Sequence, residues 1–550
     1  MKIALIQQNA IIGDPDYNIK QSVETVTRAL HQEAELIIFP ELSLLGYPPE
    51  DLLAYSSLIE RQFSALKQLL PLSQKAMIIV GGIEHNKTGK GKPYFNSALV
   101  LYQGRIQNSV HKTLLPTYDV FNEDRYFEPA AHRKCIHFKG FCIALTICED
   151  IWDMVSDGRY SVSPLQELAA ENPDFFINIT ASPYTFNKHI QRQNLVAAQC
   201  KEYNLSGIYV NQVGAQTELL FDGNSFVMDP KGDLVWQGPA FTDCVAIMDV
   251  QKGQAPKPLQ AEDTGLYDPS NHTGLAALQK ALICGIRDYF SKNGFKQAVV
   301  GSSGGIDSAL TLTLACQALG PKNVHALIMP TDFSSDHSVT DAIELSQNLG
   351  NPYQVVPIHS AFEHFCNLLE GVYGPTSFDV TEENLQSRIR GLILMAYSNK
   401  KGNLLLNTSN KSEMAVGYGT LYGDMAGALS VIGDLYKKQV YALSYFLNLD
   451  QELIPVSILH KEPSAELKPN QKDSDSLPDY EMLDAILSMH IDHNKSASEM
   501  IEQGMDPHVV ERILKLVRIS EYKRYQAPPI LKVSDRTFGK GRIIPLTHKL

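Results

Sequence analysis

Residues 301–310, GSSGGIDSAL, have the composition and the setting of a loop that binds phosphate. The loop follows the apolar run 297–300 and leads into a helical pattern at 309–319. A glycine-rich loop between a strand and a helix points backbone N–H groups and the positive end of the helix at a phosphate. A loop that handles the terminal phosphates of ATP would have a Lys just before its last Ser or Thr. Here that position holds Asp307, so this loop is expected to bind phosphate in another way.

The carboxylate of Asp307 would repel phosphate unless a cation lies between them. We therefore expect Asp307 to bind Mg²⁺, while hydroxyl and backbone N–H groups of the loop bind phosphate oxygens. An ordinary glycine-rich turn would explain the glycines alone equally well, but the whole string Ser-Gly-Gly-Ile-Asp-Ser is much more specific. The residues of the loop that are expected to bind ATP are Gly301, Ser302, Ser303, Gly304, Gly305, Ile306, Asp307 and Ser308.

Strand and helix patterns alternate around this loop. Strands are expected at 298–300, 325–329, 354–357 and 403–407, and helices at 273–292, 308–319, 338–349 and 382–399. This alternation predicts a doubly wound parallel sheet, whose ligands bind beyond the carboxyl ends of the strands. The quoted loop lies at such an end. The polar segment 461–480 shows little predicted structure, and we expect it to form a mobile lid.

The first half of the chain is a separate alternating series. Strands are expected at 3–8, 36–39, 77–84, 97–102, 141–147, 175–179, 207–211, 225–228 and 245–250, and helices at 18–33 and 188–203. They predict an α/β domain with one extensive mixed sheet covered by helices. The stretch 251–262 contains two Pro and no apolar periodicity, which is typical of a linker. We therefore expect a first domain at 1–252, a linker at 253–264 and a second domain at 265–550.

Composition narrows the class of protein. The chain has 550 residues, of which 44% are hydrophobic and 20% are charged, as in a soluble globular protein of two or more domains. A net charge of −13 disfavours a broad nucleic-acid surface, and no apolar run approaches the length of a membrane span. The N-terminal residues turn polar too soon for a signal peptide. Eight Cys without zinc-type spacing indicate reduced thiols and a cytoplasmic protein.

The phosphate loop resembles that of the ATP pyrophosphatases, which split ATP between the α and β phosphates. Within them, 383–391 (ENLQSRIRG) and 404–427 closely resemble NAD synthetases, which activate deamido-NAD as an acyl adenylate and then admit ammonia. The resemblance implies that Thr408, Lys437 and Ser464 contact ATP. It further implies that Glu413 lies near the metal and the substrate, and that Asn384, Arg388, Glu413 and Lys523 hold deamido-NAD. The i, i+4 spacing of Asn384 and Arg388 puts them on one helix face.

A candidate nucleophile lies in the first half, where Cys148 directly follows the predicted strand 141–147. A nucleophilic Cys needs a base and a positive neighbour, and the candidates are Glu41 in "FPEL" and Lys112 in "VHKT". Taken singly, each of these charged residues is more often a surface charge, and a Cys at such a place is more often an inert core residue.

Together these three motifs resemble the Glu–Lys–Cys triad of the nitrilase superfamily, and the match extends over most of residues 1–250. The resemblance implies an αββα sandwich in which Glu41 is the general base, Lys112 stabilises the oxyanion and Cys148 attacks an amide carbon. It also implies that Glu123 is an additional carboxylate beside the triad. Tyr118 is expected to line the pocket that binds glutamine.

A nitrilase-like half joined to an NAD synthetase half is the arrangement of glutamine-dependent NAD synthetases. This resemblance implies an enzyme that takes ammonia from glutamine and uses ATP and Mg²⁺ to convert deamido-NAD to NAD. It also implies a homo-oligomer, at least a dimer. Three alternatives remain at this stage: another glutamine-dependent amidoligase of the same fold, an inactive nucleotide-binding protein, and a hydrolase with an ATP-sensing domain.

Overall fold

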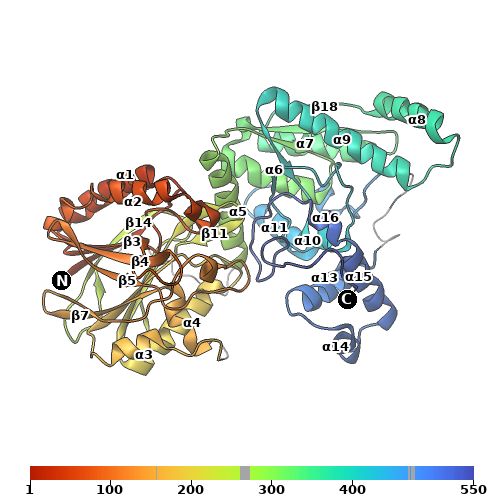
Figure 1. Cartoon of the computed structure of the whole chain (residues 1–550). Helices are drawn as coiled ribbons and strands as arrows, with labels where there is room; N and C mark the ends of the chain where they lie inside the picture. Colours follow the sequence, from red (N-terminus) through yellow and green to blue (C-terminus); the bar gives the residue numbers. More distant parts are fainter. Residues whose placement is uncertain (156–157, 260–272, 469–470, 472–476, 550) are drawn as a thin grey trace. The chain divides into compact units, whose positions relative to one another are not determined.

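The computed structural model describes residues 1–155, 158–259, 273–468, 471 and 477–549. The chain divides into two compact units, Met1–Pro269 and Ser270–Leu550, and each is described by itself (Figure 1). The predicted bounds of the domains and of the linker stay predictions, because the division falls within 260–272, outside the described residues. No described helix has the length and the apolar character needed to cross a membrane.

Unit 1 contains two sheets rather than the one extensive sheet predicted above. The seven-stranded sheet has the order β15 (Lys257–Pro258), β14 (Cys244–Asp249), β1 (Lys2–Gln7), β2 (Leu36–Ile38), β3 (Met77–His85), β4 (Tyr94–Tyr102), β5 (Arg105–His111). The six-stranded sheet has the order β13 (Leu234–Gln237), β12 (Phe226–Met228), β9 (Ser206–Asn211), β8 (Phe175–Thr180), β7 (Phe141–Ile147), β6 (Ile136–Phe138). A separate hairpin joins β10 (Val213–Gln216) to β11 (Leu219–Asp222).

The two sheets pack face to face because their central strands are apolar on both sides. Ile3 and Leu5 of β1 share one core cluster with Phe175 and Ile177 of β8, so this cluster lies between the sheets. The alternate residues of β1, such as Ile6, pack instead with helices α1 (Pro15–His31) and α2 (Ser56–Leu66). Helices α3 (Pro164–Ala169) and α4 (Lys188–Tyr203) cover the second sheet, on the opposite side of the unit (Figure 1). The αββα sandwich is confirmed.

Strands β5 and β15 are among the strands that lie where none was predicted. Strand β5 is mostly polar and solvent-exposed, so it lacks the apolar alternation that marked its neighbours. Strand β15 lies inside the expected linker, where it pairs with β14 at the edge of the first sheet. Both are edge strands, which need little apolar surface because one side has no neighbour in the sheet.

Unit 2 is built around a five-stranded parallel sheet of order β18-β17-β16-β19-β20. These strands are β16 (Ala298–Gly301), β17 (Val324–Ile328), β18 (Tyr353–Val355), β19 (Leu404–Asn407) and β20 (Leu429–Ser430). The chain winds outward from β16 in one direction to β18 and then in the other direction from β19. The glycine-rich loop follows β16, at the point where the winding reverses, which is where ligands bind in such sheets. The doubly wound sheet is confirmed.

Helices connect and extend this sheet (Figure 1). They are α5 (Thr273–Lys292), α6 (Ile306–Leu319), α7 (Asp336–Leu349), α8 (His359–Tyr373), α9 (Val380–Lys401), α10 (Lys411–Val416), α11 (Lys437–Leu447) and α12 (Val456–His460). A C-terminal group follows: α13 (Tyr480–Ile491), α14 (Ala497–Glu502), α15 (Pro507–Ile519) and α16 (Glu521–Arg524). Helices α10, α13 and α15 share a core cluster of their own, which fixes the C-terminal group against the end of the sheet.

Two candidate active sites

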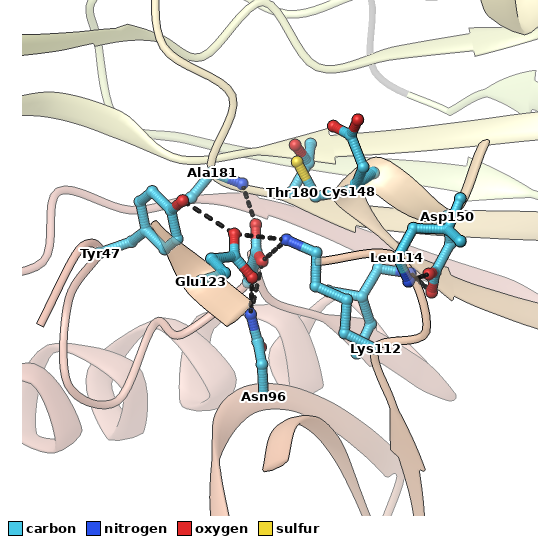
Figure 2. A network of polar contacts seen from close by, with 12 residues as sticks. Tyr47, Asn96, Lys112, Leu114, Glu123, Cys148, Asp150, Thr180 and Ala181 are labelled. Carbon is cyan, nitrogen blue, oxygen red and sulfur yellow. Dashed lines mark hydrogen bonds and ion pairs between the residues drawn. The ribbon is translucent and has the colours of Figure 1, made fainter. Parts of the chain in front are cut away.

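In unit 1, strand ends bring together the three residues of the predicted triad. Glu41 follows β2, Lys112 follows β5, and Cys148 follows β7 of the other sheet. The side chains of Glu41 and Lys112 are fully buried, and Cys148 is 6% exposed. Figure 2 shows Lys112 and Glu123 in one network, with Cys148 and Thr180 beside it.

Lys112 lies between two carboxylates. Its Nζ donates to Oε1 of Glu41 at 2.8 Å and to Oε1 of Glu123 at 2.7 Å. Nδ2 of Asn96 donates to Oε1 of Glu41 at 2.7 Å, and the Tyr47 hydroxyl donates to Oε1 of Glu123 at 2.8 Å. The second oxygen of Glu41 accepts from the backbone N–H of Ala181 at 2.8 Å. Each buried charge therefore has partners that fix its position.

Burial and the neighbouring charges shift the pKa values of these groups. Burial raises the pKa of Glu123 to about 7, although Lys112 opposes this shift. Burial would lower the pKa of Lys112, but the carboxylates of Glu123 and Glu41 outweigh it and raise that pKa well above its usual value. Burial, together with the charge of Glu41, raises the pKa of the Cys148 thiol. Cys148 is therefore a thiol at neutral pH, and its activation requires a base.

Cys148 lies on a sharp turn from β7 into the 3-10 helix Cys148–Ile151, with a positive φ of 43°. Left-handed backbone is unfavourable for a residue with a side chain, so surrounding contacts must hold it. The carboxylate of Asp150 provides them. It accepts from the backbone N–H of Ile147 at 3.1 Å and from those of Thr113 and Leu114 at 2.9 Å. Asp150 thus ties the turn of Cys148 to the residues that follow Lys112.

A glycine allows the strand beside Glu41 to approach closely. A Cβ at Gly81 in β3 would lie 2.3 Å from the backbone N of Leu42 and the backbone O of Pro40. Any side chain at this position would push β3 away from the turn that carries Glu41.

Tyr118 lies beside the residue that follows the nucleophile. Its hydroxyl donates to the Glu149 carboxylate at 3.0 Å, and the Tyr160 hydroxyl donates to the same carboxylate at 2.7 Å. The guanidinium of Arg159 lies 4.2 Å from the centre of the Tyr118 ring. This position near Cys148 is compatible with a wall of the substrate pocket, and the role of Tyr118 in binding glutamine stays a prediction.

Sequence reasoning missed several members of this network. Asn96 lies within β4, and Tyr47 and Ala181 lie in loops, so no local pattern marks them. The acidic pair after Cys148 was visible in the sequence, but the different partners of Glu149 and Asp150 become evident only in three dimensions.

In unit 2, most residues predicted to bind ATP line one cavity of about 280 Å³. Besides the loop, the cavity is lined by Thr408, Glu413, Lys437 and Ser464. Gly304 is the exception in the loop. Its φ is +77°, and a Cβ there would lie 2.2 Å from the backbone O of Ser338, so glycine lets the loop pack against α7.

Lys437 lies between the two predicted metal ligands. Its Nζ is 2.5 Å from Oδ2 of Asp307 and 3.4 Å from Oε1 of Glu413, and these charges raise its pKa against the effect of burial. Nδ2 of Asn410 donates to the other oxygen of Asp307 at 2.9 Å. Among the described residues no three His, Cys, Asp or Glu side chains form a metal cluster. Two carboxylates nevertheless fit Mg²⁺, which is usually held by one or two of them together with substrate phosphates.

The residues predicted to hold deamido-NAD, other than Glu413, surround the loop 417–421 and are not part of the cavity wall. Oδ1 of Asn384 accepts from the Thr420 hydroxyl at 2.7 Å, and Nε of Arg388 donates to the Leu421 carbonyl at 3.2 Å. Nζ of Lys523 donates to the carbonyls of Gly417 and Gly419. Asn384 and Arg388 therefore lie on one face of α9, as predicted.

The segment predicted to form a lid is described only in part, because 469–470 and 472–476 lie outside the described residues. Residues 461–467 line the cavity. Oε1 of Glu466 accepts from the Ser338 hydroxyl at 2.8 Å and from Nζ of Lys461 at 2.7 Å. This part of the segment is therefore attached to the first turn of α7.

Comparisons with known proteins agree with this division. The family model of carbon-nitrogen hydrolases matches residues 2–256, and that of NAD synthases matches residues 278–527. The chain is 43% identical to the glutamine-dependent NAD(+) synthetase of Synechocystis sp., over 99% of this chain and 98% of that protein. It is 40% identical to the corresponding protein of Acinetobacter baylyi, over 100% and 98%. The solved structure of the Acinetobacter baumannii glutamine-dependent NAD+ synthetase with ADP is similar, with a TM-score of 0.78, 36% identity and coverage of 99% and 98%.

Proposed function

Because this chain belongs to the family of glutamine-dependent NAD(+) synthetases, we propose that each of its units carries out one half of the family's reaction. The protein is a ligase that amidates deamido-NAD to NAD with ATP, and it takes the nitrogen from glutamine. The other products are glutamate, AMP and pyrophosphate. Unit 1 supplies ammonia and unit 2 activates deamido-NAD.

In unit 1, Cys148 is the nucleophile and Glu41 is its base. Glu41 takes the thiol proton, and the sulfur bonds to the side-chain carbonyl carbon of glutamine. The Lys112 ammonium stabilises the oxyanion until the C–N bond breaks, and ammonia leaves with the proton that Glu41 held. Water then loses a proton to Glu41 and attacks the thioester, which releases glutamate. The proton on Glu41 returns to the Cys148 sulfur.

One observation carries this assignment most directly: Lys112, fully buried, is held by two carboxylates beside a thiol whose pKa is raised. A buried ammonium needs compensation, and both carboxylates supply it while keeping Nζ in place. Glu123 is a positioning group in this proposal, because it holds Lys112 and does not take the thiol proton.

In unit 2, the cavity beyond β16 binds ATP. Hydroxyls of Ser302, Ser303 and Ser308, with backbone N–H groups of the loop, bind the pyrophosphate that departs. Asp307 and Glu413 are the residues that would hold Mg²⁺, which supplies Lewis-acid activation and neutralises phosphate charge when it is bound. Lys437, which pairs with both carboxylates, adds a positive charge for the phosphates.

Thr408 and Ser464 line the same cavity and complete the ATP contacts. Deamido-NAD binds beside the loop 417–421, where Asn384, Arg388 and Lys523 are positioned, and Glu413 faces it from the cavity. Its carboxylate attacks the α-phosphorus of ATP, the bond to pyrophosphate breaks, and ammonia then displaces AMP from the acyl adenylate.

We also propose that the enzyme acts as a homo-oligomer, at least a dimer, in the cytoplasm. Helix α8 has no buried residue, and Leu392 and Met395 on α9 are 59% and 40% exposed, which supports an apolar contact with a second copy. All eight cysteines are free thiols, which supports a reducing compartment.

The proposal is tested by measuring NAD formed from deamido-NAD, ATP and Mg²⁺ with either glutamine or ammonium. We expect synthesis from both nitrogen sources, and loss of both when a chelator removes Mg²⁺. Other carboxylic acids in place of deamido-NAD should not release pyrophosphate. Equal release with another acid would show that the second unit activates a different substrate.

A further inference from the structure

Arg390 on α9 is a half-buried cation in the wall of the unit 2 cavity. Its Nε donates to the backbone carbonyl of Met329, just beyond the end of β17, at 3.0 Å. Among the described residues this is the one hydrogen bond of its guanidinium, and none of them forms an ion pair with it. Neither Nη atom is among the described buried polar atoms that lack a hydrogen-bond partner, so both are accessible to solvent. Two donor groups of a half-buried cation are therefore available to a ligand in the cavity.

The carboxylates nearest to Arg390 are already engaged elsewhere. Asp424 accepts from the Ser387 hydroxyl at 2.9 Å and from the backbone N–H of Thr420 at 2.7 Å. Glu466 is held by α7 and Lys461, as described above. Both act on Arg390 through their charge, but neither pairs with it. Burial lowers the pKa of Arg390 only to about 10, so the guanidinium stays charged at neutral pH.

A charged guanidinium without a carboxylate partner in a partly closed cavity matches an anionic ligand. The backbone contact at Nε fixes the plane of the guanidinium while leaving both Nη groups free. The cavity also contains the glycine-rich loop and Thr408, so the anion would lie within the proposed ATP site.

We propose that Arg390 binds substrate through its Nη groups, which contact an anionic oxygen where ATP and the carboxylate it activates meet. This oxygen belongs either to the α-phosphate of ATP or to the carboxylate of deamido-NAD. The proposal rests on the assignment of this cavity to ATP. In either case Arg390 would hold one of the two reacting groups in place for formation of the acyl adenylate.

The test compares Arg390→Met and Arg390→Lys with Lys400→Met in the full-length protein. Lys400 lies exposed in the last turn of the same helix, so its variant loses a charge away from the cavity. The dissociation constant of a non-hydrolysable ATP analogue is measured without deamido-NAD, and kcat and KM for deamido-NAD are measured with ammonium. Thermal unfolding reports on the fold.

We expect Arg390→Met to reduce kcat/KM by about 100-fold, a typical loss for a charge-assisted contact in a site. The Arg390→Lys variant should recover part of the lost kcat/KM, because lysine keeps the positive charge but lacks the paired donors of the planar guanidinium. Weaker binding of the ATP analogue alone assigns the phosphate. A raised KM for deamido-NAD with unchanged binding of the analogue assigns the carboxylate.

A folded Arg390→Met enzyme whose constants for both substrates match those of Lys400→Met would overturn the proposal and leave Arg390 as a cap for β17. If Arg390→Met does not fold, wild-type constants in Arg390→Lys would overturn it equally. The Asp307→Asn variant distinguishes a failure of the role proposed for Arg390 from a failure of the assignment of the cavity to ATP. Its activity should be lost if the cavity binds ATP, whereas retention in Asp307→Asn would refute the assignment of the cavity itself.

Discussion

Each of the two sites contains a lysine between two carboxylates, but the carboxylates differ in how far they are exposed to solvent. In unit 1 the side chain of Lys112 and those of its partners Glu41 and Glu123 are 0%, 0% and 5% exposed. In unit 2 Lys437 is 3% exposed, but Asp307 and Glu413 are 19% and 17% exposed and face a cavity. The first network is closed, and the second opens toward the place where ATP is proposed to bind.

This difference in exposure indicates that the two networks respond differently when their substrates bind. A closed network is already arranged for its reaction, and only the amide substrate has to enter. In the open network the carboxylates can exchange contact with Lys437 for contact with a metal and phosphates, at little cost, because water reaches them. We therefore expect pH to control unit 1 and Mg²⁺ to control unit 2.

The strongest way to break the comparison is Asp307→Asn. An amide is a poorer ligand for Mg²⁺ than a carboxylate, so we expect NAD formation to fall about 10³-fold or more with either nitrogen source. The measurement is initial velocity at limiting Mg²⁺, with the thermal unfolding midpoint as the control for folding. Near-normal velocity under these conditions would show that Asp307 does not bind the metal.

A matched pair of variants sharpens the comparison between closed and open networks. Lys112→Met leaves two carboxylates buried without their cation, so we expect the free energy of unfolding of unit 1 to fall by about 3–5 kcal/mol. Lys437→Met should destabilise unit 2 by less, since its carboxylates can be hydrated from the cavity. Chemical denaturation of both variants provides the values. Equal losses would mean that the two networks are equally closed.

A smaller effect is expected from Glu123→Gln, which removes one of the charges that raise the pKa of Lys112. The pKa of Lys112 should fall, so the alkaline limb of glutamine hydrolysis should move to lower pH. Because the pKa of Glu123 itself is about 7, wild-type Glu123 becomes neutral as the pH falls below that value. The two profiles should therefore converge on the acid side. Profiles that coincide at alkaline pH would remove Glu123 from the support of Lys112.

Sequence patterns predicted where the strands and helices lie better than they predicted which strands pair with each other. Apolar runs such as β7 and β8 mark a buried strand, but they do not say which sheet the strand joins, and the nitrilase resemblance was needed to separate two sheets. The polar strand β5 escaped detection although Lys112 lies directly after it. Its position is set by pairing with β4, which is a long-range contact.

The candidate sites show the same limit. Cys148, Glu41 and Asp307 lie in short motifs whose residue types already suggest chemistry. Asn96 and Arg390 lie in the middle of regular elements, where a polar residue ordinarily faces solvent. Only the fold shows that one of them supports Glu41 and that the other lines a cavity.

The central claim is that unit 1 makes ammonia and unit 2 uses it, and Cys148→Ala tests it most directly. This change removes the proposed nucleophile and alters no residue that is assigned to ATP or deamido-NAD. NAD formation is measured with glutamine and, separately, with an ammonium salt at alkaline pH, where more nitrogen is present as NH₃. The account predicts that synthesis from glutamine falls to background while synthesis from ammonium continues. Loss of both activities in a folded protein, or synthesis from glutamine that persists, would contradict it.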